Sequence, residues 1–178
     1  MKLPIAYYGN PILRKKCKDV EEFDDEIREF VNNMIETLED KNGIGLAAPQ
    51  VNRELRIFIT KVPYPSKDDP DQWEDGTIKV YINPKLSEPS AEAWERDEGC
   101  LSIPKIYIPV IRPYRVKVEA MDLKGNVFTE ELSGLEARCV MHENDHINGV
   151  LMIDRIQGEK RKEIESELRS IKKELGSQ

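Results

Sequence analysis

The stretch GLEARCVMHENDHING, residues 134–149, carries the only two histidines of the chain, His142 and His146. Four residues make about one turn of an α-helix, so both imidazoles project from the same face and can bind one metal ion. Glu143 lies one step round the helix, close enough to reach a water on that ion without being a ligand. The H-E-x-x-H pattern therefore predicts a metal site on a helix spanning residues 134–148.

The residues around this motif predict where the helix begins and ends and which face is buried. Ser133 and Glu136 have the spacing of a capping box at the N-terminus, and Gly149 is suited to end the helix. The face that carries the histidines continues backwards through Cys139 and Leu135, which are both apolar. A pair of imidazoles on an apolar face indicates a partly buried site.

Two further helices are predicted from apolar residues spaced three and four apart. The first spans residues 24–40 and can be capped by Asp24 or Asp25. The second spans residues 158–175 and carries mixed charges on its outer face. The apolar positions of the first helix are Ile27, Phe30, Val31, Met34, Ile35 and Leu38, and those of the second are Ile164, Leu168, Ile171 and Leu175.

Strands and loops occupy the middle of the chain. The predicted strands are residues 55–59, 78–82 and 106–111, and the two arms of a hairpin around the turn at 122–126. The predicted loops, rich in glycine, proline or aspartate, are residues 41–50 and 63–77. Antiparallel strands with separate helices indicate an α+β fold. We expect antiparallel sheets packed around the helix that carries the H-E-x-x-H motif, with an N-terminal helix and a C-terminal amphipathic helix.

The composition of the 178 residues excludes several classes of protein. Hydrophobic residues make up 39% of the chain, which is enough for the core of one domain. The net charge of −7 argues against a protein that coats nucleic acid or anionic membrane. Three cysteines are too few for a disulfide framework, and no run of apolar residues is long enough to span a membrane. We expect a cytoplasmic protein without membrane association or direct nucleic-acid specificity.

The third metal ligand is open at this point, because a catalytic site needs three protein ligands and the chain has no third histidine. Cys139 is one turn before His142 and crowded, and Cys17 lies in the basic stretch RKKCKD. Cys100, in the glycine-flanked turn DEGCLSIP, is the preferred cysteine. The alternative ligand is a downstream glutamate, for which the candidates are Glu159, Glu163, Glu165 and Glu167. A closed, structural metal site in a small binding domain is a third interpretation.

Three segments together resemble the signature motifs of one family, the peptide deformylases. They are GIGLAAPQ at 43–50, EGCLS at 98–102 and HENDH at 142–146, in the order that the family has. GNPILR at 9–14 and GVLMIDRI at 149–156 are also similar to sequences that flank those motifs. The resemblance implies a deformylase-like catalytic domain over residues 1–157, with residues 158–178 as a C-terminal helix of the same domain.

The resemblance implies a metal-dependent hydrolase that removes the formyl group from the N-terminal formylmethionine of nascent polypeptides and releases formate. The metal ligands that it implies are Cys100, His142 and His146. Glu143 is implied to be the catalytic acid and base, with Gln50 and the backbone N–H of Leu101 forming the oxyanion hole. Gly45 is implied to lie beside the substrate backbone. The residues implied around the methionine side chain are Ile44, Glu98, Leu135 and Cys139.

The metal and the partners also follow from the resemblance. Mixed sulfur and nitrogen ligands by themselves favour zinc. The family resemblance implies one ferrous ion, with zinc, nickel or cobalt as substitutes, and we adopt iron. Formylmethionine-bearing nascent peptides are the implied substrates. The resemblance further implies that the C-terminal helix contacts the ribosome near the exit tunnel, whereas its weakly basic composition equally suits a helix packed on its own domain.

Overall fold

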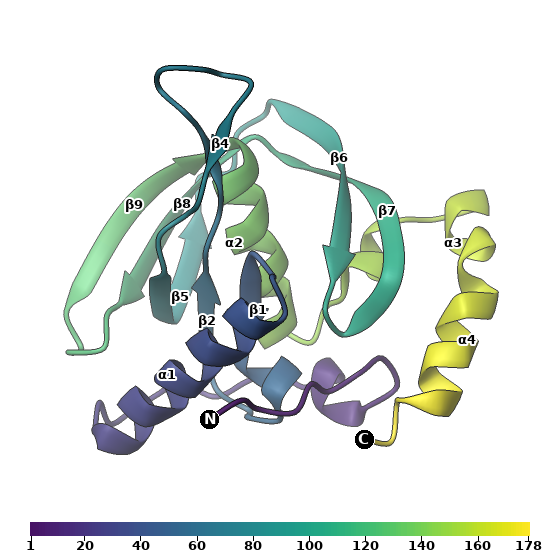
Figure 1. Cartoon of the computed structure of the whole chain (residues 1–178), viewed down its shortest axis with the longest axis horizontal. Helices are drawn as coiled ribbons and strands as arrows, with labels where there is room; N and C mark the ends of the chain where they lie inside the picture. The colour runs from purple at the N-terminus through teal and green to yellow at the C-terminus, as the bar shows by residue number, and fades with distance from the viewer.

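The computed structural model describes all residues, Met1–Gln178, and places helix α2 (Gly134–Ile147) between two antiparallel sheets (Figure 1). The larger sheet has the strand order β1-β2-β5-β8-β9, and the smaller sheet pairs β6 with β7. This arrangement confirms the predicted α+β fold. The strands of the larger sheet are β1 (Gly45–Ala47), β2 (Ile57–Thr60), β5 (Lys79–Ser87), β8 (Arg115–Met121) and β9 (Val127–Ser133). The smaller sheet consists of β6 (Ala93–Cys100) and β7 (Ile103–Pro113).

Helix α1 (Asp25–Asp40) forms as predicted, and Asp24 is its cap. The Ile27 N–H donates to Asp24 Oδ1 over 3.0 Å, which satisfies one of the free donors at the helix start. The apolar face of α1 packs on one face of the larger sheet, in a cluster that includes Ile57 and Ile59 of β2. Burial of one helix face only is the physical reason why the periodicity was visible in the sequence.

Helix α2 packs on the opposite face of the larger sheet, where Ala137 and Val140 cluster with Phe58 of β2. Because helices cover both faces, all four residues of β2, which lies where a strand was predicted, are buried. The expected capping box is wrong. Ser133 makes no side-chain cap hydrogen bond, and Glu136 instead accepts a hydrogen bond from Lys79 Nζ. The helix ends at Ile147, and Gly149, with a φ of 74°, follows its end as expected.

Several short elements differ from the predictions. The expected loop at 41–50 contains β1 and a 3-10 helix, η2 (Ala48–Val51). The expected loop at 63–77 contains a small hairpin of β3 (Tyr64–Pro65) and β4 (Trp73–Glu74). Strand β6 was not predicted, because most of its side chains are exposed and show no alternation of apolar and polar residues. The β8–β9 hairpin, with Gly125 at a φ of 82° in its turn, is confirmed.

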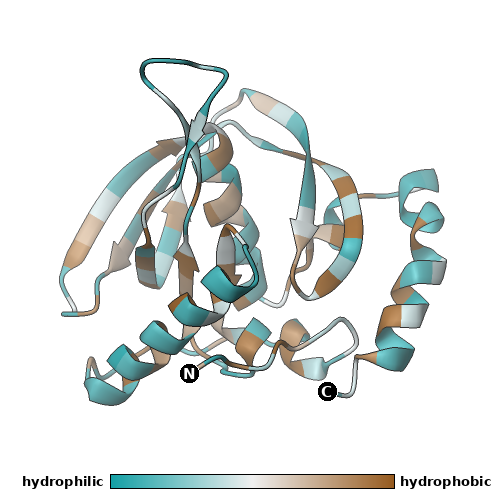
Figure 2. Cartoon of the chain, in the orientation of Figure 1, coloured by the Kyte–Doolittle hydropathy of each residue, from teal (hydrophilic) through white to brown (hydrophobic).

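The C-terminal segment covers the smaller sheet. Two helices, α3 (Glu159–Glu163) and α4 (Glu165–Glu174), replace the single helix predicted over 158–175, because the backbone leaves the helical conformation at Ile164. Leu168 and Ile171 of α4 are buried in a cluster with apolar residues of β7. Figure 2 shows hydrophilic residues along α3 and hydrophobic residues along β7. Two more 3-10 helices complete the fold, η1 (Pro11–Arg14) and η3 (Met152–Arg155).

None of the helices combines the length and the apolar composition that a membrane span requires.

Candidate metal and catalytic site

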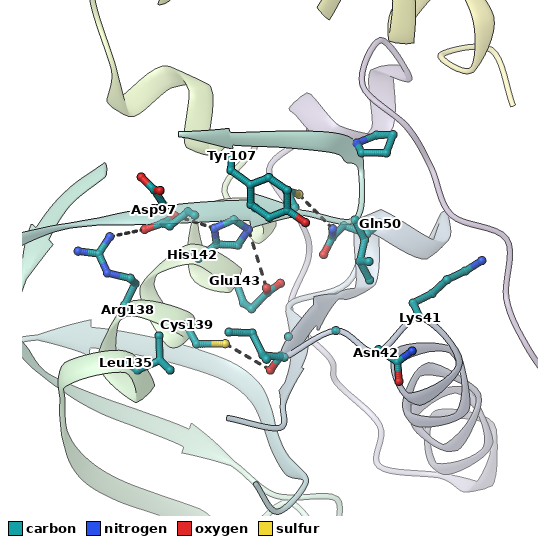
Figure 3. Close-up of a pocket in the computed structure, with 18 of the residues that line it drawn as sticks. Lys41, Asn42, Gln50, Asp97, Tyr107, Leu135, Arg138, Cys139, His142 and Glu143 are labelled. Carbon is teal, nitrogen blue, oxygen red and sulfur yellow. Dashed lines mark hydrogen bonds and ion pairs between the residues drawn. The ribbon is translucent and has the colours of Figure 1, made fainter. Parts of the chain in front are cut away.

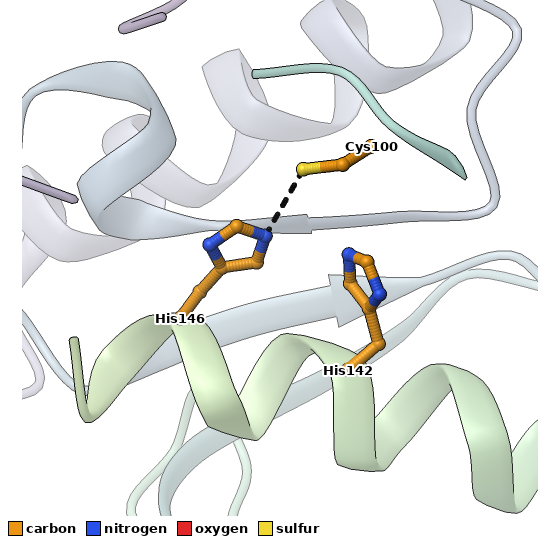
Figure 4. A group of neighbouring side chains, drawn as sticks. All are labelled: Cys100, His142 and His146. Atoms are coloured by element: carbon orange, nitrogen blue, oxygen red, sulfur yellow. Dashed lines mark hydrogen bonds between the residues drawn. The ribbon is translucent and has the colours of Figure 1, made fainter. Parts of the chain in front are cut away.

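The two histidines of α2 and the cysteine at the end of β6 meet in one cluster (Figure 4). The ligand atoms of Cys100, His142 and His146 all lie within 4.8 Å of one another. Cys100 Sγ is 3.3 Å from His146 Nε2, and the centroids of the two imidazole rings are 5.1 Å apart. Both histidines are buried, and Cys100 is half-buried. The predicted helical spacing thus brings both imidazoles to the same cysteine.

This donor set fits a divalent transition metal. Metal–sulfur and metal–nitrogen bonds of about 2.3 and 2.1 Å in a tetrahedral site separate neighbouring ligand atoms by about 3.6 Å. The distance between Cys100 and His146 is close to that value. One thiolate with two imidazoles suits zinc and ferrous iron alike. The cluster contains these three protein ligands and no fourth one. A metal ion held by them would keep one coordination position for water or substrate.

The alternative third ligands lie outside the cluster of Cys100, His142 and His146. Burial raises the pKa of the Cys139 thiol well above its usual range, and this thiol donates to the carbonyl oxygen of Ile44 over 3.4 Å. Burial also raises the pKa of Cys17 to about 11. Glu165 accepts a hydrogen bond from Arg161, and none of the C-terminal glutamates belongs to the cluster. Cys100 is therefore the third donor.

Glu143 has one free carboxylate oxygen inside the site (Figure 3). Its Oε1 is 4.0 Å from His142 Nε2, and its Oε2 is buried without a hydrogen-bond partner. Burial raises the pKa of Glu143 to about 7. A carboxyl group with a pKa near neutrality can both take up and release a proton during a reaction.

Gln50 presents its amide nitrogen to the same space. Its side-chain oxygen accepts the Ala47 N–H over 2.9 Å, which fixes which way the amide points. The Gln50 Nε2 then donates towards Ser102 Oγ at 3.2 Å and Cys100 Sγ at 3.5 Å. Leu101 follows Cys100 in the turn between β6 and β7 and also lines the cavity. One oriented donor, the Gln50 side-chain amide, therefore lies beside the metal cluster, and Leu101 lines the cavity next to it.

A cavity of about 450 Å³ opens onto the cluster. Every site residue predicted from the sequence lines this cavity, except His146, which belongs to the metal cluster but does not line the cavity. Gly45 has no room for a side chain, because a Cβ atom there would be 2.6 Å from Glu143 Oε1. Tyr107, which is 73% exposed, stands at the edge of the cavity. Further lining residues that the sequence did not indicate are Lys41, Asn42, Asp97, Pro104, Lys105 and Arg138.

Glu98 has a structural connection to the metal cluster that sequence reasoning missed. Its Oε1 lies 2.8 Å from His142 Nδ1, so the other ring nitrogen of His142 faces the cluster. Arg112 donates to both carboxylate oxygens, and Arg138 donates to Oε2 over 2.7 Å. Burial by itself raises the pKa of Glu98, but hydrogen bonds from Arg112 and His142 outweigh it and hold the pKa well below its usual range. Glu98 is therefore an ionised partner of His142.

Asp145 directly precedes His146 on α2, and its side chain accepts hydrogen bonds from arginines and not from a histidine. Its Oδ2 accepts from Arg112 Nη1 over 3.0 Å, and its Oδ1 accepts from Arg155 Nη2 over 2.7 Å. The first contact joins α2 to β7 and fixes the helix against the smaller sheet. Arg112 is buried, whereas 45% of the Arg155 side chain is exposed.

The chain is similar over nearly its whole length to proteins of one family. Residues 2–162 match the family model described as polypeptide deformylase. The peptide deformylase of Christiangramia forsetii is 40% identical, over 97% of this chain and 91% of that protein. The peptide deformylase of Acinetobacter baumannii is 42% identical, over 95% of this chain and 91% of that protein.

Solved structures give the same result. The crystal structure of plant peptide deformylase PDF1B matches with a TM-score of 0.88 and 36% identity, covering 98% of this chain and 91% of that chain. The crystal structure of peptide deformylase from Thermotoga maritima matches with a TM-score of 0.78 and 38% identity. That match covers 89% of this chain and 99% of the Thermotoga chain.

Proposed function

The chain belongs to the peptide deformylase family and removes the formyl group from N-terminal formylmethionine, and from this premise we propose a role for each residue of its site. One observation carries the assignment. Two imidazoles, one thiol, a buried carboxyl with a free oxygen and an oriented amide donor converge on one cavity. These are the groups that hydrolysis of an amide requires.

Cys100, His142 and His146 hold one divalent metal ion, with ferrous iron as the resident ion and zinc, nickel or cobalt as substitutes. The bound ion supplies Lewis acidity, which lowers the pKa of the attacking water and polarises the formyl carbonyl. The hydrogen-bonding distance between Glu98 and His142 supports this ligand set, because a carboxylate partner fixes the orientation of a ligand imidazole.

Glu143 moves the proton. Its free Oε2 accepts a proton from the attacking water and then returns it to the nitrogen of the leaving amine. Gln50 Nε2 and the Leu101 N–H donate to the formyl oxygen, on which negative charge develops. One such donor is typically worth about 3 kcal/mol of transition-state stabilisation. The hydrogen bond between Ala47 and Gln50 supports this role, because the donor is already oriented before substrate binds.

The substrate end of the cavity recognises the methionine. Ile44, Leu135 and Cys139 offer an apolar surface to its side chain, and Glu98 lies at the same wall. Gly45 leaves room for the substrate backbone beside Glu143, where a larger residue has no space. The formyl carbon bears only hydrogen, so a narrow site can accept it and exclude larger acyl groups.

The setting of the protein is a further part of the proposal. Residues 158–178 form one domain with residues 1–157, which is supported by the packing of α4 on β7. Because its substrates are nascent chains, the protein works in the cytoplasm and meets the ribosome near the exit tunnel. The exposed charged face of α3 and α4 is available for that contact, since the apolar face is used for packing.

Formate release from formyl-Met-Ala-Ser tests the function and the role of Glu143 together. Protein is prepared anaerobically, loaded with ferrous iron or nickel, and compared with Glu143→Gln at equal metal content. Formate from the wild-type protein, with at least a hundredfold less from the variant, is the expected result. Absence of formate from loaded, folded wild-type protein, or cleavage of a peptide bond instead, would contradict the assignment. Cys100→Ala is expected to lose the metal.

A further inference from the structure

Arg138 is a buried arginine on α2, one turn before His142, and it makes an unusual set of contacts. Its Nη1 donates to Glu98 Oε2 over 2.7 Å and to the Val110 carbonyl over 2.8 Å. Its Nη2 donates to the Trp94 carbonyl over 2.7 Å, and its guanidinium lies 5.0 Å from the centroid of the Trp94 ring. Only 3% of the side chain is exposed. One side chain of α2 thus contacts β6 at two points and β7 at one.

These contacts matter because the metal ligands come from two parts of the fold that no β-sheet hydrogen bonds connect. Cys100 ends β6, and β6 pairs only with β7. His142 and His146 lie on α2, which packs against the larger sheet. The distance from the sulfur to the imidazoles therefore depends on side chains that connect α2 with the smaller sheet.

The two arginines on Glu98 connect these parts in different ways. Arg112 belongs to β7 and grips both oxygens of Glu98, which is on the neighbouring strand of the same sheet. It reaches α2 only through Asp145. Arg138 starts on α2 and reaches the backbone carbonyls of both strands directly. Arg112 therefore holds the carboxylate from within the smaller sheet, whereas Arg138 joins this sheet to the helix directly.

We propose that Arg138 is a positioning residue for the metal site, which holds the strand bearing Cys100 at the correct distance from His142 and His146. This inference rests on the proposed function for its biological meaning, but its test measures metal binding. A second explanation is that Arg138 only forms a wall of the cavity, which it also lines. That explanation predicts an effect on the KM for substrate and none on the metal.

Two substitutions separate these possibilities. Arg138→Met keeps an unbranched apolar stem against the cavity but removes all three hydrogen-bond partners. Arg138→Lys keeps the charge, yet a single ammonium cannot reproduce the planar, three-acceptor contact. Arg56→Met is the matched control, because Arg56 is a largely buried arginine that donates to the carbonyl of Pro84, away from the cavity.

The measurement is the dissociation constant for Co(II), obtained anaerobically by competition with a chelator, together with the visible absorption of the cobalt–thiolate complex. We expect Arg138→Met to weaken Co(II) binding about 10- to 100-fold and to change the absorption bands, as loss of a supporting partner typically does. Arg138→Lys should give an intermediate loss. Arg56→Met should leave the Co(II) affinity and the absorption bands unchanged, even if it lowers the stability of the fold.

Three results would overturn the inference. The first is wild-type Co(II) affinity and spectrum in Arg138→Met with a raised KM, which would make the residue a cavity wall. The second is wild-type Co(II) affinity and spectrum in Arg138→Lys. This variant keeps the test decisive if Arg138→Met does not fold. The third is an equal loss in Arg56→Met. If the wild-type protein released no formate, but Arg138→Met still weakened Co(II) binding as expected, the proposed function would be contradicted and this inference would stand.

Discussion

Gly45 illustrates how closely the chain packs around the reacting groups. A Cβ atom at this position would lie 2.6 Å from Glu143 Oε1 and 2.9 Å from Cys139 Sγ, so the carboxylate must move if any side chain is added. We expect Gly45→Ala to lower kcat/KM for formyl-Met-Ala-Ser about a hundredfold, because a shift of about 1 Å in a catalytic group has that effect. Formate release measured at equal metal content checks this. An alanine variant with wild-type activity would show that Glu143 has room to spare.

Cys17 gives a pH dependence to stability that can be tested away from the metal. Its thiol has a folded-state pKa of about 11, raised by burial from the usual value of about 9. The protonated thiol therefore contributes stability that is fully present below pH 9 and is lost as the pH rises through 11. The loss is on the order of 2 kcal/mol.

Urea unfolding of the wild type and of Cys17→Ala between pH 8 and about 11 measures this difference. The variant starts less stable because of the cavity, but its free energy of unfolding should fall less steeply with pH. Parallel curves for the two proteins would mean that Cys17 ionises as easily when folded as when unfolded.

Individual site residues could be predicted from sequence where their spacing alone carries the chemistry. His142, Glu143 and His146 are of this kind, because helix geometry relates them directly. The contacts between Glu98 and Arg138 are not, since they join residues 40 positions apart through β6, a strand that was not predicted. The choice of Cys100 came from its turn and from the family resemblance, and only the fold brings it to the histidines.

Among the elements, those buried on one face were predictable and those shaped by the site were not. Helix α1 and the β8–β9 hairpin show their periods because one side packs and the other meets solvent. Strand β6 shows none, because residues 97–100 contribute to the cavity or its edge instead of alternating. The C-terminal helix was predicted in the right place, but the break at Ile164 leaves no mark in the apolar pattern.

The N-termini of α1 and α2 provide a matched pair of predictions. Asp24 accepts a backbone hydrogen bond at the start of α1, so Asp24→Ala should lower the free energy of unfolding by about 1 kcal/mol. Ser133 makes no side-chain hydrogen bond at the start of α2, so Ser133→Ala should change it by less than about 0.5 kcal/mol. Urea denaturation of both variants checks this. A larger loss at Ser133 than at Asp24 would reverse the assignment of the caps.

At the scale of the whole molecule, the metal ligands connect the smaller sheet to α2. A metal that binds only the folded protein should therefore stabilise the entire chain, by about 3 kcal/mol at a concentration a hundred times its dissociation constant. Thermal unfolding with nickel and with a chelator measures the effect.

Two cysteine variants control for it. Cys100→Ala should unfold at the same temperature with and without nickel, because it lacks a ligand. Cys139→Ala should keep the shift, since its thiol faces the Ile44 carbonyl and not the cluster. Nickel stabilisation that survives in Cys100→Ala would mean that the ion binds elsewhere.

The β3–β4 hairpin lies apart from the metal site. It pairs with no other strand, projects beyond the larger sheet in Figure 1, and contributes no residue to the cavity over the metal cluster. We therefore expect catalysis to place little constraint on the length of this hairpin. Insertions and deletions among species should accumulate between residues 63 and 77, while the chain from Cys100 to His146 keeps its length.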